Sequence, residues 1–272
     1  MRTWHLKLVY ISLVCTSLLS CEDVIEVDLP SPTPQLVIDA LIGYNANDGN
    51  PITIGQVRLT MTTNFFEENI PPARDATVTI IDETTGVLFP LTEGEPGVFR
   101  DGFPELQFDR PYTLRVVYQG QVYESTERIQ PTGEIENVEQ GDGFLLDEDE
   151  ETEVKVTFAD IPNERNYYLF AFGFDNYLVT DDEFYQDKSL SFSYFYENVD
   201  PGDLLTITLI GVNREFANYV NQALVQSGDG GTGFGVPPAT VRGNIINTTD
   251  SNNFPFGYFA IGEADSAFLR VQ

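Results

Sequence analysis

The chain has 272 residues, and its 43 Asp and Glu against 14 Lys and Arg set a formal net charge of −29 at pH 7. An acidic surface of this kind repels phosphate backbones and anionic lipid headgroups, so nucleic acid is a poor partner and charge alone does not dock the protein on a membrane. A chain of this length fills one large domain or two ordinary ones.

Residues 1–20 predict a cleaved signal peptide. Arg2 and Lys7 precede a mostly apolar run from Leu8 to Leu19, which is too short to span a bilayer. The stretch Leu18-Leu19-Ser20-Cys21 is typical of a lipoprotein signal, so we expect acyl chains such as palmitate on Cys21. The alternative is ordinary secretion without lipid, but a leucine three residues before the cleavage point favours the lipoprotein form.

Cleavage before Cys21 would also restrict the available chemistry. It removes Trp4, His5 and Cys15, and it leaves 12 basic against 43 acidic residues, a net charge of −31. The mature chain then contains no histidine, no tryptophan and no free thiol. These losses exclude a Ser-His-Asp triad, a Cys-His nucleophile, a zinc site built on His or Cys, and an intramolecular disulfide.

The remaining chain predicts a mainly β fold made of two tandem β-sandwich domains. We expect the following parts: a lipidated, proline-rich tether over 21–34, an N-terminal sandwich over 35–129, an acidic linker over 130–152, and a C-terminal β-domain with one helix over 153–272.

The N-terminal domain shows short strands separated by turns. Residues 76–82 alternate apolar and polar side chains, and residues 112–118 and 121–126 predict a hairpin across Gln119-Gly120. About seven strands at this spacing are typical of an immunoglobulin-like or transthyretin-like sandwich.

In the C-terminal domain the hydrophobic period changes once. Residues 214–226 carry apolar side chains at helical spacing, whereas the other apolar segments of this domain predict strands. Asn213 is a suitable N-cap for this helix and Gly228 a suitable stop. The predicted strands are 153–158, 166–174, 190–196, 204–212, 239–246, 256–262 and 267–271.

The linker ends in five adjacent acidic residues, 147–151. Their oxygens offer a candidate calcium site, with Asp147, Asp149 and Glu151 as ligands. The alternative, which we favour, is a solvated run of charge. No other cofactor is expected.

The second half carries an ordered series of short motifs. It runs from Val156-Thr157-Phe158-Ala159-Asp160 through Pro201-Gly202-Asp203 and the helix with Tyr219 to Gly257-Tyr258-Phe259-Ala260. This order resembles a family of Bacteroidota outer-membrane lipoproteins, domain of unknown function 4249. The resemblance implies an outer-membrane lipoprotein that accompanies a TonB-dependent receptor, and it implies no catalytic residues. Glu22 and Asp23 are similar to the acidic signal that sends such lipoproteins to the cell surface.

These observations favour a non-enzymatic accessory or ligand-binding protein at the outer membrane. The alternatives are a structural adhesin or matrix lipoprotein and, with less support, a hydrolase built on paired carboxylates. Aromatic and acidic side chains of the second domain are the candidates for a ligand or partner surface, because aromatic rings suit stacking on sugars or peptides. The alternative, which we favour, places the aromatic residues of this region in a sandwich core and the acidic residues in solvated turns. The candidates are Tyr177, Asp181, Asp182, Glu183, Tyr185, Tyr194 and Tyr196.

Overall fold

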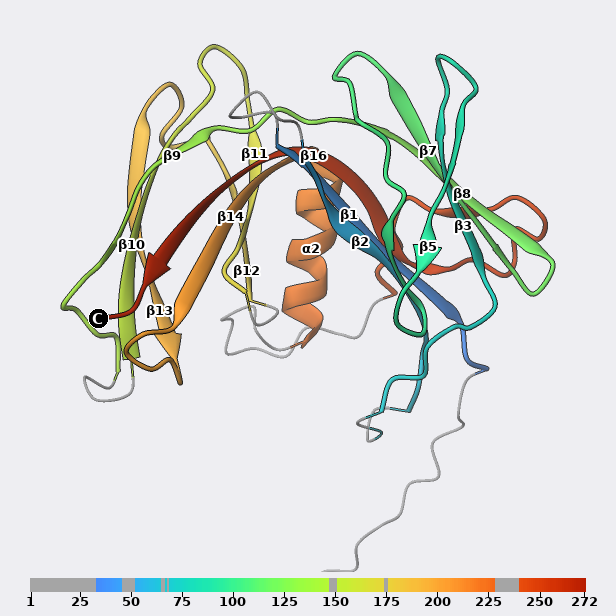
Figure 1. Ribbon diagram of the computed structural model, residues 1–272, viewed down its shortest axis with the longest axis horizontal. Helices are drawn as coiled ribbons and strands as arrows, with labels where there is room; N and C mark the ends of the chain where they lie inside the picture. Colours follow the sequence, from blue (N-terminus) through green and yellow to red (C-terminus); the bar gives the residue numbers. More distant parts are fainter. Residues whose placement is uncertain are drawn as a thin grey trace, which may run out of the picture. The chain divides into compact units, whose positions relative to one another are not determined.

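The computed structural model describes residues 33–45, 52–64, 67, 69–146, 151–173, 176–227 and 240–272 (Figure 1). The expectations for Cys21, Glu22 and Asp23, for the helix stop at Gly228 and for Asp147 and Asp149 lie outside these residues.

An eight-stranded sheet, in the order β12-β11-β14-β16-β1-β2-β6-β5, forms the centre of the described chain. Its strands are β1 (Leu36–Asn45), β2 (Ile52–Met61), β5 (Thr92–Glu93), β6 (Val98–Asp101), β11 (Tyr167–Ala171), β12 (Tyr177–Asp181), β14 (Leu204–Val212) and β16 (Phe256–Arg270).

Two smaller sheets accompany it. One has the order β15-β8-β7-β3-β4, and the other has the order β13-β10-β9. Their strands are β3 (Thr77–Asp82), β4 (Leu88–Pro90), β7 (Pro111–Tyr118), β8 (Gln121–Arg128), β9 (Glu134–Gln140), β10 (Glu151–Ala159), β13 (Ser189–Glu197) and β15 (Ile246–Asn247). The mainly β sandwich fold expected from the sequence is therefore confirmed.

Strand β16 shows how the layers are arranged, because its side chains alternate between the two faces of the large sheet. Phe259 and Ile261 enter a core shared with the five-stranded sheet. Val271, just beyond the strand, enters a second core shared with the three-stranded sheet. Tyr258 and Ala260 belong instead to a third core. The five-stranded and the three-stranded sheet thus pack on the same face of the large sheet, and the third core lies on the opposite face.

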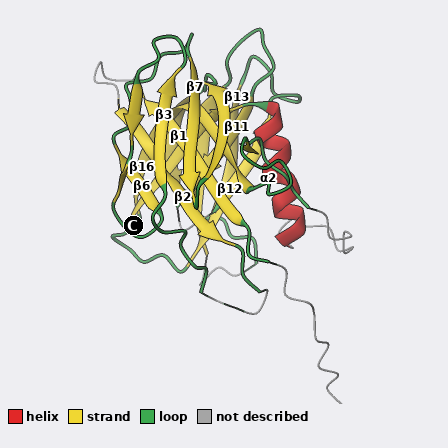
Figure 2. Cartoon of the chain, turned by 90° about the vertical axis from the view of Figure 1, so that its right-hand side faces the viewer, coloured by secondary structure: helices red, strands yellow, loops and turns green. Residues whose placement is uncertain are grey.

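The third core is formed by the helix α2 (Arg214–Ser227). Phe216 and Ala217 pack against Leu169, Ile210 and Tyr258 on the sheet, and the helix is seen beside the strands in Figure 2. The helix predicted at 214–226 is confirmed. Its N-cap is confirmed as well, because the backbone N–H of Phe216 donates to Asn213 Oδ1 at 2.7 Å.

The hairpin predicted in the N-terminal half is also confirmed. Strands β7 and β8 pair in register up to Tyr118 and Gln121. The two loop residues, Gln119 and Gly120, have φ values of 49° and 76°. Positive φ at both positions is the two-residue turn whose twist matches that of the strands.

The large sheet joins segments from both predicted domains. Strand β1 runs parallel to β16 over eight residue pairs, from Val37 with Phe256 to Tyr44 with Glu263. Figure 1 shows β16 passing from the side of β7 and β8 to the side of β10 and β13. The boundaries expected at 129 and 153 therefore do not divide this sheet, and residues 34–272 group as one compact unit.

Two local expectations are wrong. The segment expected as linker contains the strand β9, whose Ile135 and Val138 pack on the second core. These two residues are three apart, so they show no simple alternation. The register against β10 shifts between Thr157 and Phe158, and this bulge turns both residues inward.

The strand expected over 239–246 is reduced, among the described residues, to the pair Ile246–Asn247. The Asn244 side chain takes the place of a strand backbone: its Oδ1 accepts the Phe259 N–H at 2.9 Å and its Nδ2 donates to the Phe259 carbonyl at 2.8 Å. Strand β16 is continuous from Phe256 to Arg270, although the sequence predicted two strands there. None of the helices described is long and apolar enough to cross a membrane.

Candidate functional site

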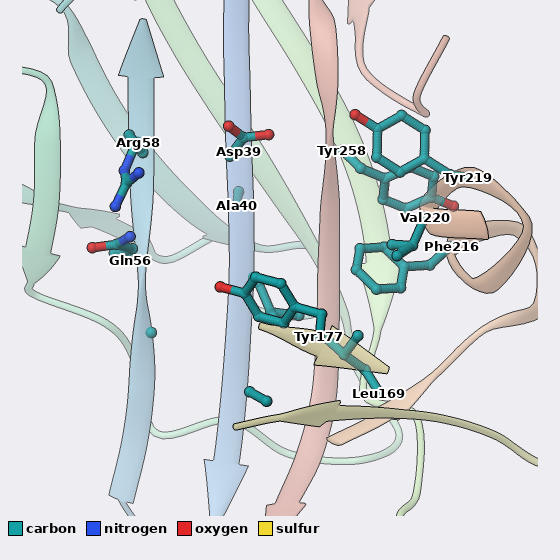
Figure 3. A pocket seen from close by; sticks show the side chains of 13 residues that line it. Asp39, Ala40, Gln56, Arg58, Leu169, Tyr177, Phe216, Tyr219, Val220 and Tyr258 are labelled. Atoms are coloured by element: carbon teal, nitrogen blue, oxygen red, sulfur yellow. The ribbon is translucent and has the colours of Figure 1, made fainter. Parts of the chain in front are cut away.

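A cavity of about 430 Å³ lies between α2 and the helix-facing side of the large sheet. This volume is within the range of small-molecule sites in proteins. Figure 3 shows polar side chains on β1 and β2 along one side of the cavity and aromatic side chains along the other. The lining residues are Asp39, Ala40, Leu41, Gly55, Gln56, Arg58, Leu169, Ala171, Tyr177, Phe216, Tyr219, Val220 and Tyr258.

The polar side consists of Asp39, Gln56 and Arg58. Asp39 on β1 is the direct cross-strand partner of Arg58 on β2, and Gln56 lies two residues from Arg58 on the same face. Arg100 on β6 donates to Gln56 Oε1 from Nε and Nη2 at 3.1 and 3.0 Å. These bonds occupy the amide oxygen and leave the amide nitrogen of Gln56 as a donor.

The aromatic side combines rings from three elements. Phe216 and Tyr219 on α2 both contact Tyr258 on β16, with ring centroids 5.2 Å apart in each pair. Phe216 and Tyr258 are buried, whereas Tyr177 on the edge strand β12 is 46% exposed. Tyr177 is therefore the ring most open to a ligand, and the others form a fixed wall behind it.

The walls of the cavity shift the pKa of two facing groups. The protein groups around the Asp39 carboxyl displace part of its water, and this desolvation raises its pKa although the residue is exposed. The charge of Arg58 offsets part of that rise. Burial raises the pKa of Tyr219 to about 12, with a further contribution from the Asp39 charge. Tyr219 is thus a neutral hydroxyl at any physiological pH.

A second, more polar cavity of about 390 Å³ shares Tyr219 and Tyr258 with the first. Its Glu127 carboxylate accepts bonds from both Asn213 and Asn244, at 3.0 and 2.6 Å. Burial is the main cause that raises the pKa of Glu127, and Glu215 raises it further by charge repulsion. Because the two asparagines also cap α2 and hold β16, Glu127 has a clear structural role.

The candidate residues proposed from the sequence do not meet in one site. Tyr177 lines the cavity below α2, but Asp181, at the end of β12, and Glu183, in the turn that follows, both face Arg165, at 3.4 and 2.9 Å. Asp182 is 1% exposed. Its Oδ2 accepts the Asn166 N–H at 2.9 Å, and its Oδ1 has no hydrogen-bond partner among the described residues.

The remaining three tyrosines pack in or against the second core. Tyr185 is buried, with its hydroxyl 3.2 Å from Thr180 Oγ1, and Tyr196 donates its hydroxyl proton to the Phe172 carbonyl at 2.9 Å. Tyr194 stacks on Phe172 with a centroid distance of 3.9 Å. Tyr194 and Tyr196 also line a cavity of about 470 Å³ that lies apart from the one under α2.

Of the three carboxylates expected as calcium ligands, Glu151 alone lies within the described residues. Glu151 accepts backbone N–H groups of Leu145 and Leu146, at 2.5 and 3.1 Å for Oε2. Across the described residues, no group of three or more His, Cys, Asp or Glu side chains is placed to hold a metal ion.

Sequence reasoning missed Asp39, Arg58 and the aromatic wall of α2 and β16. One signal was present: Asp39 interrupts the apolar segment 36–42, at a position whose neighbours Val37 and Leu41 are apolar. In a central strand both faces are normally covered, so a charge at such a position marks a site.

A search of curated proteins finds no match to the chain. A family model described as a domain of unknown function (DUF4249) matches residues 22–267, which include the helix, the residues that line the cavity below it, and all strands except the last three residues of β16. The chain belongs to the DUF4249 family.

Proposed function

We propose that this protein is a non-catalytic, lipid-anchored binding protein on the outer face of an outer membrane, where it serves a TonB-dependent nutrient transporter as an accessory. The observation that carries the proposal is the cavity below α2, which offers polar groups on one side and aromatic rings on the other. This division is typical of sites that orient a small ligand.

The sequence supplies the location. The lipoprotein signal ending at Cys21 provides the anchor, and Glu22-Asp23 provides the acidic signal for surface export. The chain belongs to the DUF4249 family. Its motifs resemble those of Bacteroidota outer-membrane lipoproteins, and this resemblance supports the proposed location.

The chemistry of the cavity favours binding over catalysis. Its side chains include a carboxylate, a guanidinium, an amide and tyrosine hydroxyls, but no thiol, imidazole or lysine. A hydrolase of the carboxylate type would have to use a pair such as Glu127 and Glu215 in the neighbouring cavity. Both oxygens of Glu127 are already bonded to asparagine side chains, so this alternative has less support.

The experiment is co-purification from detergent-solubilised outer membranes of the native organism. The tagged wild-type protein is compared with an equally tagged, unrelated lipoprotein. Specific enrichment of a TonB-dependent receptor supports the proposal. Enrichment of no transporter, together with cell–cell binding that depends on the protein, would instead establish the adhesin alternative.

A further inference from the structure

Within the described chain, Asp39 and Arg58 are opposite charges that face each other and do not pair. They are direct cross-strand partners on β1 and β2, where side chains begin about 5 Å apart and oppositely charged pairs normally interact. Neither side chain forms an ion pair or a hydrogen bond with another described residue. Figure 3 shows the guanidinium of Arg58 directed along its strand toward Gln56, while Asp39 stands on the next strand.

The donors and the acceptor are therefore separated within one cavity. Arg58 and the amide nitrogen of Gln56 form a donor group on β2, because Arg100 occupies the Gln56 oxygen. A carboxylate matches two adjacent donors of this kind. Asp39 on β1 accepts only, as an ionised carboxylate does, and it matches an ammonium group.

The aromatic side fits an apolar side chain. Tyr177 and Tyr219 present rings opposite the charged residues, backed by the buried Phe216 and Tyr258. Leu169 and Val220 complete this apolar surface. A molecule that satisfies the whole cavity has a positive group, a negative group close to it, and an apolar part.

The overall charge of the ligand follows from the same residues. The charges of Asp39 and Arg58, the two charged residues that line the cavity, sum to zero, so the cavity favours a ligand without net charge. The chain around it has a net charge of −29, which repels anions. A neutral polyol would displace water from both charged side chains and offer neither of them a group of opposite charge, and this costs binding free energy in a partly enclosed site.

We propose that the cavity below α2 binds a zwitterion with an apolar side chain, that is, a free amino acid or a short peptide with free termini. The carboxylate lies on Arg58 and Gln56, the ammonium on Asp39, and the side chain against Tyr177 and Tyr219. This inference rests on the proposed binding function and specifies its ligand class.

The first test is isothermal titration of the detergent-solubilised mature protein with L-phenylalanine. Phenylalanine is expected to bind with 1:1 stoichiometry. Phenylalanine amide lacks the carboxylate, N-acetylphenylalanine lacks the ammonium, and glycine lacks the side chain, so each is expected to bind at least tenfold more weakly. The dipeptide alanyl-phenylalanine distinguishes the two ligand classes. Tighter binding of the dipeptide than of phenylalanine identifies a short peptide as the ligand, and weaker binding identifies a free amino acid.

The second test uses Asp39→Asn, which removes the charge and keeps the size of the side chain, and Arg58→Gln, which removes the charge and shortens the side chain. Each is expected to weaken phenylalanine binding at least tenfold with the melting temperature unchanged. Asp101→Asn and Arg74→Gln, at exposed positions outside the cavity, are matched controls that retain binding. Failure of both phenylalanine and the dipeptide to bind, equal binding of the doubly capped N-acetylphenylalanine amide, or binding of glucose in their place would overturn the inference. Receptor co-purification is measured separately, so the proposed function can stand if the ligand class is wrong.

Discussion

Asn244 pairs with Phe259 as a neighbouring strand would, through both hydrogen bonds of the Phe259 backbone. Its amide nitrogen also donates to Glu127, which in turn accepts from Asn213 at the start of α2. One side chain thus links the central strand β16, the strand β8 and the helix that covers the cavity. Removing it leaves several polar groups without partners, although no apolar core is disturbed.

Asn244→Ala is expected to lower the free energy of unfolding by about 1–3 kcal/mol, because the buried backbone groups of Phe259 lose their partner. Urea unfolding measures the change. Asn252→Ala, in the exposed turn that follows β15, is the matched control and is expected to change stability by less than about 0.5 kcal/mol. Equal effects of the two substitutions would show that the Asn244 pairing contributes nothing.

Asn213→Ala is expected to cost about 1 kcal/mol, the usual value for the loss of an N-cap. The loss is accompanied by weaker protection of the first turn of α2, which hydrogen exchange detects. The control is Asn221→Ala, at an exposed position in the middle of the same helix. There alanine is the better helix former, so stability is expected to stay equal or rise. A neutral result at Asn213 would contradict the capping role.

Asp182→Asn is expected to stabilise the protein at pH 7. Burial is the main cause that raises the pKa of Asp182, the negative charges of Asp160 and Asp181 add to it, and the Asn166 N–H and Arg165 oppose it. A carboxyl whose pKa is higher in the folded state favours folding fully below its unfolded pKa of about 3.9 and loses that contribution as the pH rises through the folded pKa.

Urea unfolding of Asp182→Asn and of the wild type at pH 7 and below pH 4 tests this dependence. The advantage of the variant is expected at pH 7 and is expected to vanish at the lower pH. Asp181→Asn, which removes an exposed carboxylate facing Arg165, is expected to give no gain at either pH. A variant gain that persists at low pH would show that the pKa of Asp182 is not the cause.

Cys21→Ser is expected to move the protein from the membrane to the soluble fraction, because acyl chains are the only anchor that the sequence predicts. Cell fractionation and immunoblotting measure the change. Replacement of Glu22 and Asp23 by alanine is expected to keep the anchor and to reduce cleavage by external protease on intact cells. Membrane retention of Cys21→Ser contradicts the lipoprotein proposal, whereas unchanged cleavage of the alanine variant contradicts only the export signal.

Local patterns predicted most of the secondary structure. The alternation in β3, the hairpin turn at Gln119-Gly120 and the helical spacing after Asn213 all reflect contacts between near neighbours, and these elements were found. The parallel pairing of β1 with β16 joins residues more than 200 positions apart. No local pattern records such a pairing, so two consecutive domains were expected where the large sheet is continuous.

The candidate site depended on the same long-range pairing. Asp39, Arg58 and Tyr258 share one face only because β1 lies between β2 and β16. Tyr177 was proposed from its aromatic character, and it lines the cavity because β12 is the edge strand beside β11. Tyr185 and Tyr196 share that character, yet they lie in the second core, since aromatic composition does not distinguish a wall from a core.

The cavity below α2 is the proposed binding site, and blocking it tests this proposal most directly. Ala171 lines the cavity on β11, so Ala171→Trp fills it, whereas Thr206→Trp adds the same bulk at an exposed position of β14 outside it. Calorimetric titration with phenylalanine is expected to show binding by the wild type and by Thr206→Trp, and none by Ala171→Trp at an unchanged melting temperature. Undiminished binding by Ala171→Trp would contradict the account.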